Sequence, residues 1–110
     1  MNIFTGHQLR LERQRLRLSL HGLAGLANCP GASAQQLSCF EYGGRLREDV
    51  LRRLEYVLES LDIIQRSFPF SLNTKDVASL KLALAAYERG DTRWFTEREV
   101  KPELPDVITF

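Results

Sequence analysis

Residues 18–43 read LSLHGLAGLANCPGASAQQLSCFEYG and hold two short helical patterns with a sharp break between them. Ser19 is a suitable N-cap for a helix over 20–27, and Ser33 is one for a helix over 34–42. The Asn-Cys-Pro-Gly run between them cannot be helical, because proline lacks an amide donor and glycine readily takes positive φ. We therefore expect two short helices joined by a tight turn.

Helical periodicity continues on both sides of this pair. Leucines and arginines interleave over 7–18, behind a capping residue at Thr5. The most regular pattern lies over 48–61, where apolar residues recur every three or four positions, and this helix should build the core. A further helix is expected over 75–89, with Gly90 ending it. The sequence thus predicts an all-α protein, a bundle of four to five short helices with a C-terminal extension helix.

Length and composition are those of one ordinary globular domain. The chain has 110 residues, of which 44% are hydrophobic and 26% charged. No apolar run approaches the roughly 20 residues that cross a bilayer, and the start lacks a signal-peptide pattern. We expect a cytoplasmic protein that does not contact a membrane.

The sequence offers no constellation for catalysis or metal binding. His7 and His21 are the only histidines, and neither accompanies a nucleophile pattern. Cys29 and Cys39 stand without a second ligand pair, which argues against a zinc site. Reduced thiols are the favoured interpretation, with a redox-sensing disulfide as the alternative. We expect no enzymatic activity, no metal and no cofactor.

Charge is distributed unevenly along the chain. Residues 1–53 contain eight arginines and four acidic residues, a net charge of +4. The whole chain carries +1, so the remaining residues carry −3. A basic first half suits a surface that contacts a nucleic acid.

The two short helices carry residues that point to a family. Their pattern is Leu18-Ser19-x-x-x-Leu23-Ala24-x-Leu26-Ala27, followed by Ser33-x-x-x-Leu37-x-x-Phe40-Glu41-x-Gly43. It resembles the lambda-repressor-like, or Xre/Cro, family of helix-turn-helix DNA-binding domains over about residues 6–64. The resemblance implies a DNA-binding domain over 1–66 whose helix 34–42 enters the major groove. It also implies a sequence-specific transcriptional regulator, a repressor of phage or mobile-element type.

The resemblance further implies that the first residues of the helix over 34–42 face base edges. In this chain these residues are Ser33, Ala34, Gln35, Gln36 and Cys39. A glutamine amide both donates and accepts hydrogen bonds, which suits the N6 and N7 atoms of adenine. Gln35 and Gln36 are therefore the expected base-reading residues, and the alternative is that both are merely solvated.

Arginines supply the expected contacts with the DNA backbone. The candidates are Arg13, Arg17, Arg45, Arg47 and Arg52. Each contact would steepen the salt dependence of binding without reading sequence. For Arg13 and Arg17, a solvated helix surface is an equally good interpretation. We interpret Glu41 as structural, an ion-pair or capping partner for an arginine.

Residues 67–110 form a C-terminal extension and a candidate dimerisation segment. Regulators of the resembled family bind two half-sites as dimers, because one recognition helix supplies too little contact. The side chains expected at the interface are Val77, Leu80, Leu84, Tyr87, Trp94 and Phe95. Residues 107–110 have the composition of a short terminal strand, which needs a partner strand. The alternative is that the helix over 75–89 caps the same core.

A second class of function fits the same fold. A small helix-turn-helix protein can act as a protein-binding inhibitor or as an antitoxin, and the net charge of only +1 favours this class. The basic first half and the paired glutamines favour double-stranded DNA. We therefore expect a DNA-binding homodimer, with a protein partner as the alternative.

Overall fold

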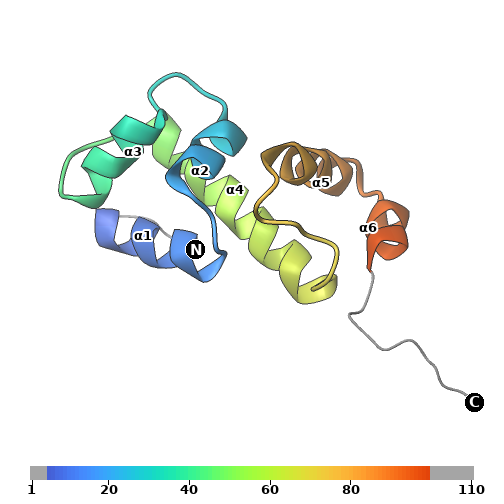
Figure 1. Ribbon diagram of the computed structural model, residues 1–110. Helices are drawn as coiled ribbons and strands as arrows, with labels where there is room; N and C mark the ends of the chain where they lie inside the picture. The colour runs from blue at the N-terminus through green and yellow to red at the C-terminus, as the bar shows by residue number, and fades with distance from the viewer. Residues whose placement is uncertain (1–4, 100–110) are drawn as a thin grey trace, which may run out of the picture.

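The computed structural model describes residues 5–99, and all regular secondary structure within them is helical (Figure 1). The elements are α1 (Gly6–Arg15), α2 (Leu20–Ala27), α3 (Ala34–Glu41), α4 (Glu48–Ser67), α5 (Val77–Arg89) and α6 (Thr92–Arg98). In Figure 1, α1 and α3 lie to the left of the long helix α4, α5 and α6 lie to its right, and α2 stands between the two groups. The all-α prediction is confirmed for these residues, whereas the strand expected over 107–110 lies outside them.

Three helices begin where hydroxyl side chains cap them. The side chains of Thr5, Ser19 and Ser33 each accept a hydrogen bond from the amide three residues ahead, at 3.2, 2.9 and 3.2 Å. These bonds satisfy amides that have no partner inside the helix. The three predicted N-caps are confirmed, and they fix the starts of α1, α2 and α3.

α1 and α3 end with the same hydrogen-bond pattern on different residues. In each case the second and third residues after the helix donate their amides back to carbonyls of its last turns. The residue that takes positive φ is Gly43 after α3, at 105°, and Arg17 after α1, at 59°. The predicted helix over 7–18 therefore ends early, because the chain reverses at an arginine where no glycine signals a stop.

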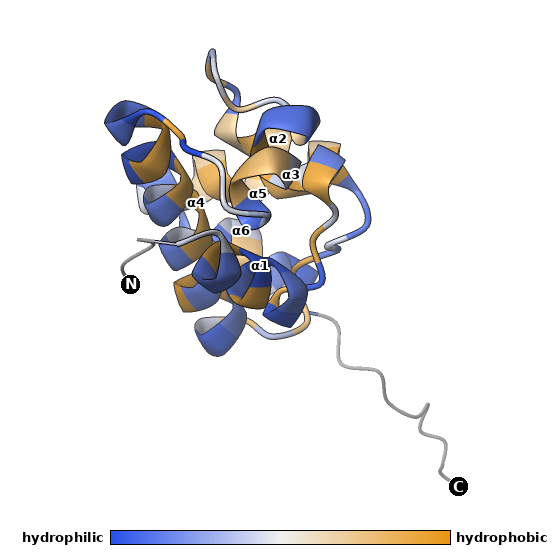
Figure 2. Ribbon diagram, turned by 90° about the vertical axis from the view of Figure 1, so that its left-hand side faces the viewer, coloured by the Kyte–Doolittle hydropathy of each residue, from blue (hydrophilic) through white to orange (hydrophobic). Residues whose placement is uncertain are grey.

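α2 is the central helix of the bundle. It is coloured largely as hydrophobic in Figure 2, and it packs against α3, α4 and α5. Its glycines permit this close packing: a Cβ atom at Gly25 would lie 3.1 Å from Cγ1 of Val77 on α5. Two glycines weaken the intrinsic helix propensity of α2, so its neighbours hold it in place.

α4 contributes to both apolar clusters that residues 5–99 form. It runs for 20 residues to Ser67, beyond the predicted end at residue 61. The main cluster contains Leu9, Leu16, Leu18, Leu23, Leu26, Leu37, Phe40, Val50, Leu54, Val57, Leu58, Leu61, Leu80 and Leu84. Ile64, one turn beyond Leu61, belongs instead to a smaller cluster with Ala83, Ala86 and Phe95. The extra turns of α4 thus connect the main core to the C-terminal helices.

The apolar stripe of α5 is used inside the molecule. Leu80 is fully buried, and Leu84 and Phe95 are only 6% and 3% exposed. Val77, Tyr87 and Trp94 are half-buried. The predicted dimer interface is wrong for the three buried residues, because their own chain already covers them. The structure matches the alternative, in which this helix caps the core.

α6 is a short helix that the sequence did not predict. The carboxylate of Asp91 accepts a hydrogen bond from the amide of Trp94 at 3.1 Å and so caps its first turn. Phe95 stacks on Phe68 with ring centres 5.2 Å apart, and Trp94 meets Phe95 edge-on at 5.0 Å. These aromatic contacts attach α6 to the end of α4.

Candidate nucleic-acid interface

One side of α3 faces solvent and the other faces the core. Leu37 and Phe40 are buried, whereas Gln35, Cys39 and Tyr42 form an exposed stripe with spacings of four and three residues. Of the other predicted base contacts, Ser33 and Gln36 are exposed and Ala34 is half-buried. The structure therefore brings Ser33, Ala34, Gln35 and Gln36 together at the start of α3, with Cys39 one turn beyond Gln35.

A surface depression of about 410 Å³ joins these residues to two of the predicted phosphate contacts. Its lining consists of Gly31, Gln35, Gln36, Cys39, Arg45, Leu46 and Arg47. The loop from α3 to α4 thus places two arginines beside the exposed amides. Amide groups can form hydrogen bonds with base edges and guanidinium groups can contact phosphates, so this lining is chemically compatible with double-stranded DNA.

The two adjacent glutamines have different roles. Gln36 completes a capping box with Ser33. The backbone N–H of Gln36 donates to Oγ of Ser33, and the side-chain Oε1 of Gln36 accepts from the backbone N–H of Ser33 at 3.0 Å. The side chain of Gln35 makes no hydrogen bond within residues 5–99. Gln35 is therefore the amide that is available to a ligand, while Gln36 first serves the helix start.

Glu41, the only acidic residue of α3, is turned inward and neutralised. Arg13 on α1 binds both of its carboxylate oxygens, at 2.8 and 3.0 Å, and also donates to the carbonyl of Leu18 at 3.0 Å. The two side chains are only 14% and 5% exposed. The structural interpretation of Glu41 is confirmed. Because the guanidinium of Arg13 is occupied by Glu41 and the carbonyl of Leu18, Arg13 is not available as a phosphate contact.

The remaining candidate arginines are all exposed, and they differ in their partners. Arg47 pairs with Asp49 at 2.6 Å and Arg52 with Glu48 at 2.6 Å, and these pairs lie in solvent. The hydrogen bond from Arg47 lowers the pKa of Asp49 below its usual value. Exposed ion pairs contribute little free energy, so a phosphate can replace either carboxylate.

Arg17 and Arg45 have no ion-pair partner in the part of the chain that the structure describes. Arg17 also holds a left-handed backbone conformation, which costs free energy for any residue with a Cβ atom. An arginine at a position that glycine would occupy more easily indicates a use for its side chain. Among the predicted phosphate contacts, these two guanidinium groups are the most available to an anion.

Arg10 and Tyr42 extend this surface, and the sequence analysis missed both. The guanidinium carbon of Arg10 lies 5.8 Å from the centre of the Tyr42 ring, and Tyr42 is 78% exposed. The sequence did contain an indication for Tyr42, because it follows Gln35 by seven positions and therefore lies on the same helix face. The pairing with Arg10 comes from the packing of α1 on α3 and has no signature in the sequence.

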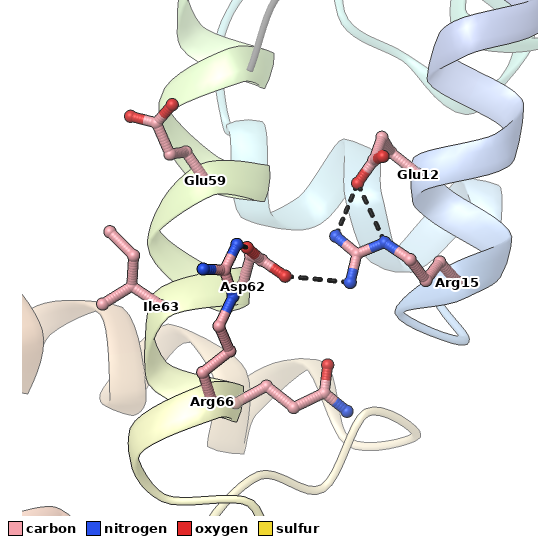
Figure 3. Close-up of a pocket in the computed structure, with 7 residues that line it drawn as sticks. Glu12, Arg15, Glu59, Asp62, Ile63 and Arg66 are labelled. Atoms are coloured by element: carbon pink, nitrogen blue, oxygen red, sulfur yellow. Dashed lines mark hydrogen bonds and ion pairs between the residues drawn. The ribbon is translucent and has the colours of Figure 1, made fainter.

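A second cavity, of about 810 Å³, lies between α1 and α4 (Figure 3), and it shares no lining residue with the depression beside α3. Asp62 in its wall binds Arg15 at 2.8 Å and also binds Arg66, and Arg15 binds Glu12 at 2.6 Å. Burial acts to raise the pKa of Asp62, but the hydrogen bonds from the two arginines outweigh it, and the pKa is lowered. Both oxygens of Asp62 are engaged, so this cluster joins two helices.

Neither other features of the described residues nor comparisons with other proteins assign a function to the chain. Among residues 5–99, no group of three or more histidine, cysteine or acidic side chains is placed to hold a metal ion. None of the helices in that range is both long enough and apolar enough to cross a bilayer. No protein-family model, curated protein or solved structure matches the chain.

Proposed function

We propose that this protein is a sequence-specific regulator of transcription that binds double-stranded DNA, a repressor of phage or mobile-element type. In this proposal α2 and α3 form the helix-turn-helix pair of a lambda-repressor-like domain, and α3 enters the major groove. The observation that carries the proposal is the outer face of α3. It presents amide, thiol and phenol groups with arginines beside them, while its only carboxylate is buried against Arg13.

The electrostatics of this face suit a polyanion. A carboxylate directed at the DNA would repel phosphates in a groove about 12 Å wide. The ion pair of Glu41 with Arg13 removes that charge from the surface and fixes the C-terminal end of α3 against α1. Gln35 then serves as the principal base-reading residue, with adenine as its natural partner.

Phosphate contacts would come from Arg17 and Arg45, with Arg47 and Arg52 exchanging their exposed carboxylate partners for phosphate. These contacts position α3 and make binding depend on salt. A homodimer on two half-sites would double the contact area. Its interface must use surface other than the stripe that α5 buries.

The proposal is tested by selecting duplexes from a randomised library with the wild-type chain, then measuring affinity by fluorescence anisotropy over a salt series. We expect Gln35→Ala to weaken binding to the selected duplex by about 1–3 kcal/mol and to bind a scrambled duplex like wild type. Gln65→Ala, which alters an amide beside the Asp62 cavity, is the matched control and should bind normally.

Two results would refute the proposal. One is a wild-type chain that enriches no sequence and shows no salt-dependent affinity for duplex DNA. The other is a Gln35→Ala variant that discriminates selected from scrambled duplex as well as Gln65→Ala does. Either result moves the assignment to the alternative class, a protein-binding inhibitor or an antitoxin.

A further inference from the structure

We propose that Arg10 and Tyr42 together form a second anchor on the DNA backbone, at the end of α3 opposite to its base-reading residues. The bound surface then spans α1 as well as α3. This inference rests on the proposed function. It assigns a ligand, the sugar-phosphate backbone beside the major groove, to an exposed pair of side chains.

The spacing along α3 supports this assignment. Tyr42 follows Gln35 by seven residues, which is about 10 Å along a helix at 1.5 Å per residue. The major groove is about 12 Å wide, so a face that reads base edges at Gln35 arrives near the phosphate ridge at Tyr42. The same face that presents Gln35 to a base therefore presents Tyr42 to the backbone.

The pair is held in position before any ligand binds. Gly6, one turn before Arg10, lies so close to α3 that a Cβ atom on it would be 1.9 Å from the carbonyl oxygen of Phe40. The ion pair between Arg13 and Glu41 lies one turn after Arg10. Two contacts thus fix α1 against the end of α3 and keep Arg10 beside Tyr42.

A second arginine–tyrosine pair in the fold shows what is unusual about this one. Arg53 lies 5.6 Å from the ring of Tyr56, its guanidinium donates to the carbonyl of Ala27, and the Tyr56 hydroxyl donates to Glu88 at 2.7 Å. That pair is satisfied internally. Within residues 5–99, the Tyr42 hydroxyl has no hydrogen-bond partner and Arg10 has no ion pair.

The chemistry of the free groups matches a phosphodiester. The phenol hydroxyl can donate one hydrogen bond to a phosphate oxygen, and the guanidinium can donate two to the same group or its neighbour. Neither group meets a carboxylate on this surface, because Glu41 is occupied by Arg13. The stacking of Arg10 on Tyr42 also reduces the number of orientations that binding must freeze.

The experiment measures affinity against salt for Arg10→Ala and Tyr42→Phe on the duplex that the wild-type chain selects. We expect Arg10→Ala to weaken binding about tenfold and to reduce the slope of log affinity against log salt by about one. Tyr42→Phe should weaken binding a few-fold with an unchanged slope, because it removes no charge. Both variants should keep the wild-type ratio between selected and scrambled duplex, since backbone contacts carry no sequence information.

Matched controls are Arg93→Ala on α6 and Tyr56→Phe on α4, and both should bind as wild type does. Normal affinity and slope for Arg10→Ala and Tyr42→Phe, with Gln35→Ala still defective, would overturn this inference and leave the proposed function intact. A changed preference between duplexes in Arg10→Ala would also overturn it, because the residue would then read bases. Failure of the wild-type chain to bind any duplex would overturn both proposals.

Discussion

At the scale of single residues, Arg17 shows how a side chain can be retained at a cost to the backbone. It occupies the position after α1 where glycine is favoured, with φ at 59° and an exposed side chain. The left-handed conformation costs about 1–2 kcal/mol for a residue with a Cβ atom, and the greater flexibility of glycine in the unfolded chain offsets part of this.

We expect Arg17→Gly to raise the free energy of unfolding by about 0.5–1 kcal/mol while it weakens DNA binding. Arg17→Ala keeps the backbone cost and should lose affinity without gaining stability. Urea denaturation and anisotropy on the same preparations check both effects. A loss of stability in Arg17→Gly would mean that the arginine side chain has a packing role.

Local rules account for which side chains of the candidate site are exposed, but not for all of their contacts. The exposure of Gln35 and Cys39 followed from helix spacing around Leu37. The sequence analysis did not assign a capping role to Gln36, although serine followed three positions later by glutamine is a capping-box pattern. The commitment of Arg13 to Glu41 was not readable, since it joins residues 28 positions apart through the docking of two helices.

At the scale of elements, the contact between α1 and α3 determines the shape of the candidate interface. Gly6 allows the first turn of α1 to touch the backbone of α3 at Phe40 and Glu41. Any side chain at position 6 would force the two helices apart. The distance between Arg10 and the end of α3 depends on this one glycine.

We expect Gly6→Ala to lower the free energy of unfolding by about 2 kcal/mol or more, because the added methyl group meets backbone atoms that cannot rotate away. Gly25→Ala is the control. There the new methyl group meets only a side-chain carbon of Val77, and the gain in helix propensity offsets the crowding. Thermal unfolding followed by circular dichroism compares them, and equal midpoints would contradict the close contact.

Helix existence was predictable for five elements, and helix ends were predictable where a side chain marked them. Ser19 and Ser33 gave the starts of α2 and α3, and Gly90, at φ 70°, gave the end of α5. α4 extends beyond its predicted end at residue 61 because Ile64 is buried in the second apolar cluster. α6 escaped prediction because its stability comes from Phe95 packing on Phe68, a contact between distant segments.

At the scale of the whole molecule, the Asp62 cluster connects the first helix to the fourth (Figure 3). Its carboxyl group has a lowered pKa in the folded chain, so the folded state holds the charged form more strongly than the unfolded state does. The resulting stability is fully present above the unfolded pKa of about 3.9 and is lost as pH falls through the lower folded pKa.

We expect Asp62→Asn to lower the free energy of unfolding by about 1–2 kcal/mol at pH 7, because the hydrogen bonds to two guanidinium groups lose their charge assistance. The difference from wild type should shrink as pH falls below about 4, because the carboxyl takes up a proton first in the unfolded chain and only at lower pH in the native chain. Asp49→Asn, in an exposed pair, should have a much smaller effect. Urea denaturation at pH 7 and below about pH 4 measures this difference. A difference in the free energy of unfolding between Asp62→Asn and wild type that does not change with pH would refute the electrostatic explanation.

The two apolar clusters on α4 also limit which segments of this chain can be removed or transferred to another protein. A fragment that stopped after α4 would uncover the surface of α2 and α4 on which Leu80 and Leu84 lie, and the freed face would adhere to other apolar surfaces. The first four helices are therefore poorly suited to recombination as a portable module. Shuffling between genes would have to transfer α5 together with the helices it covers.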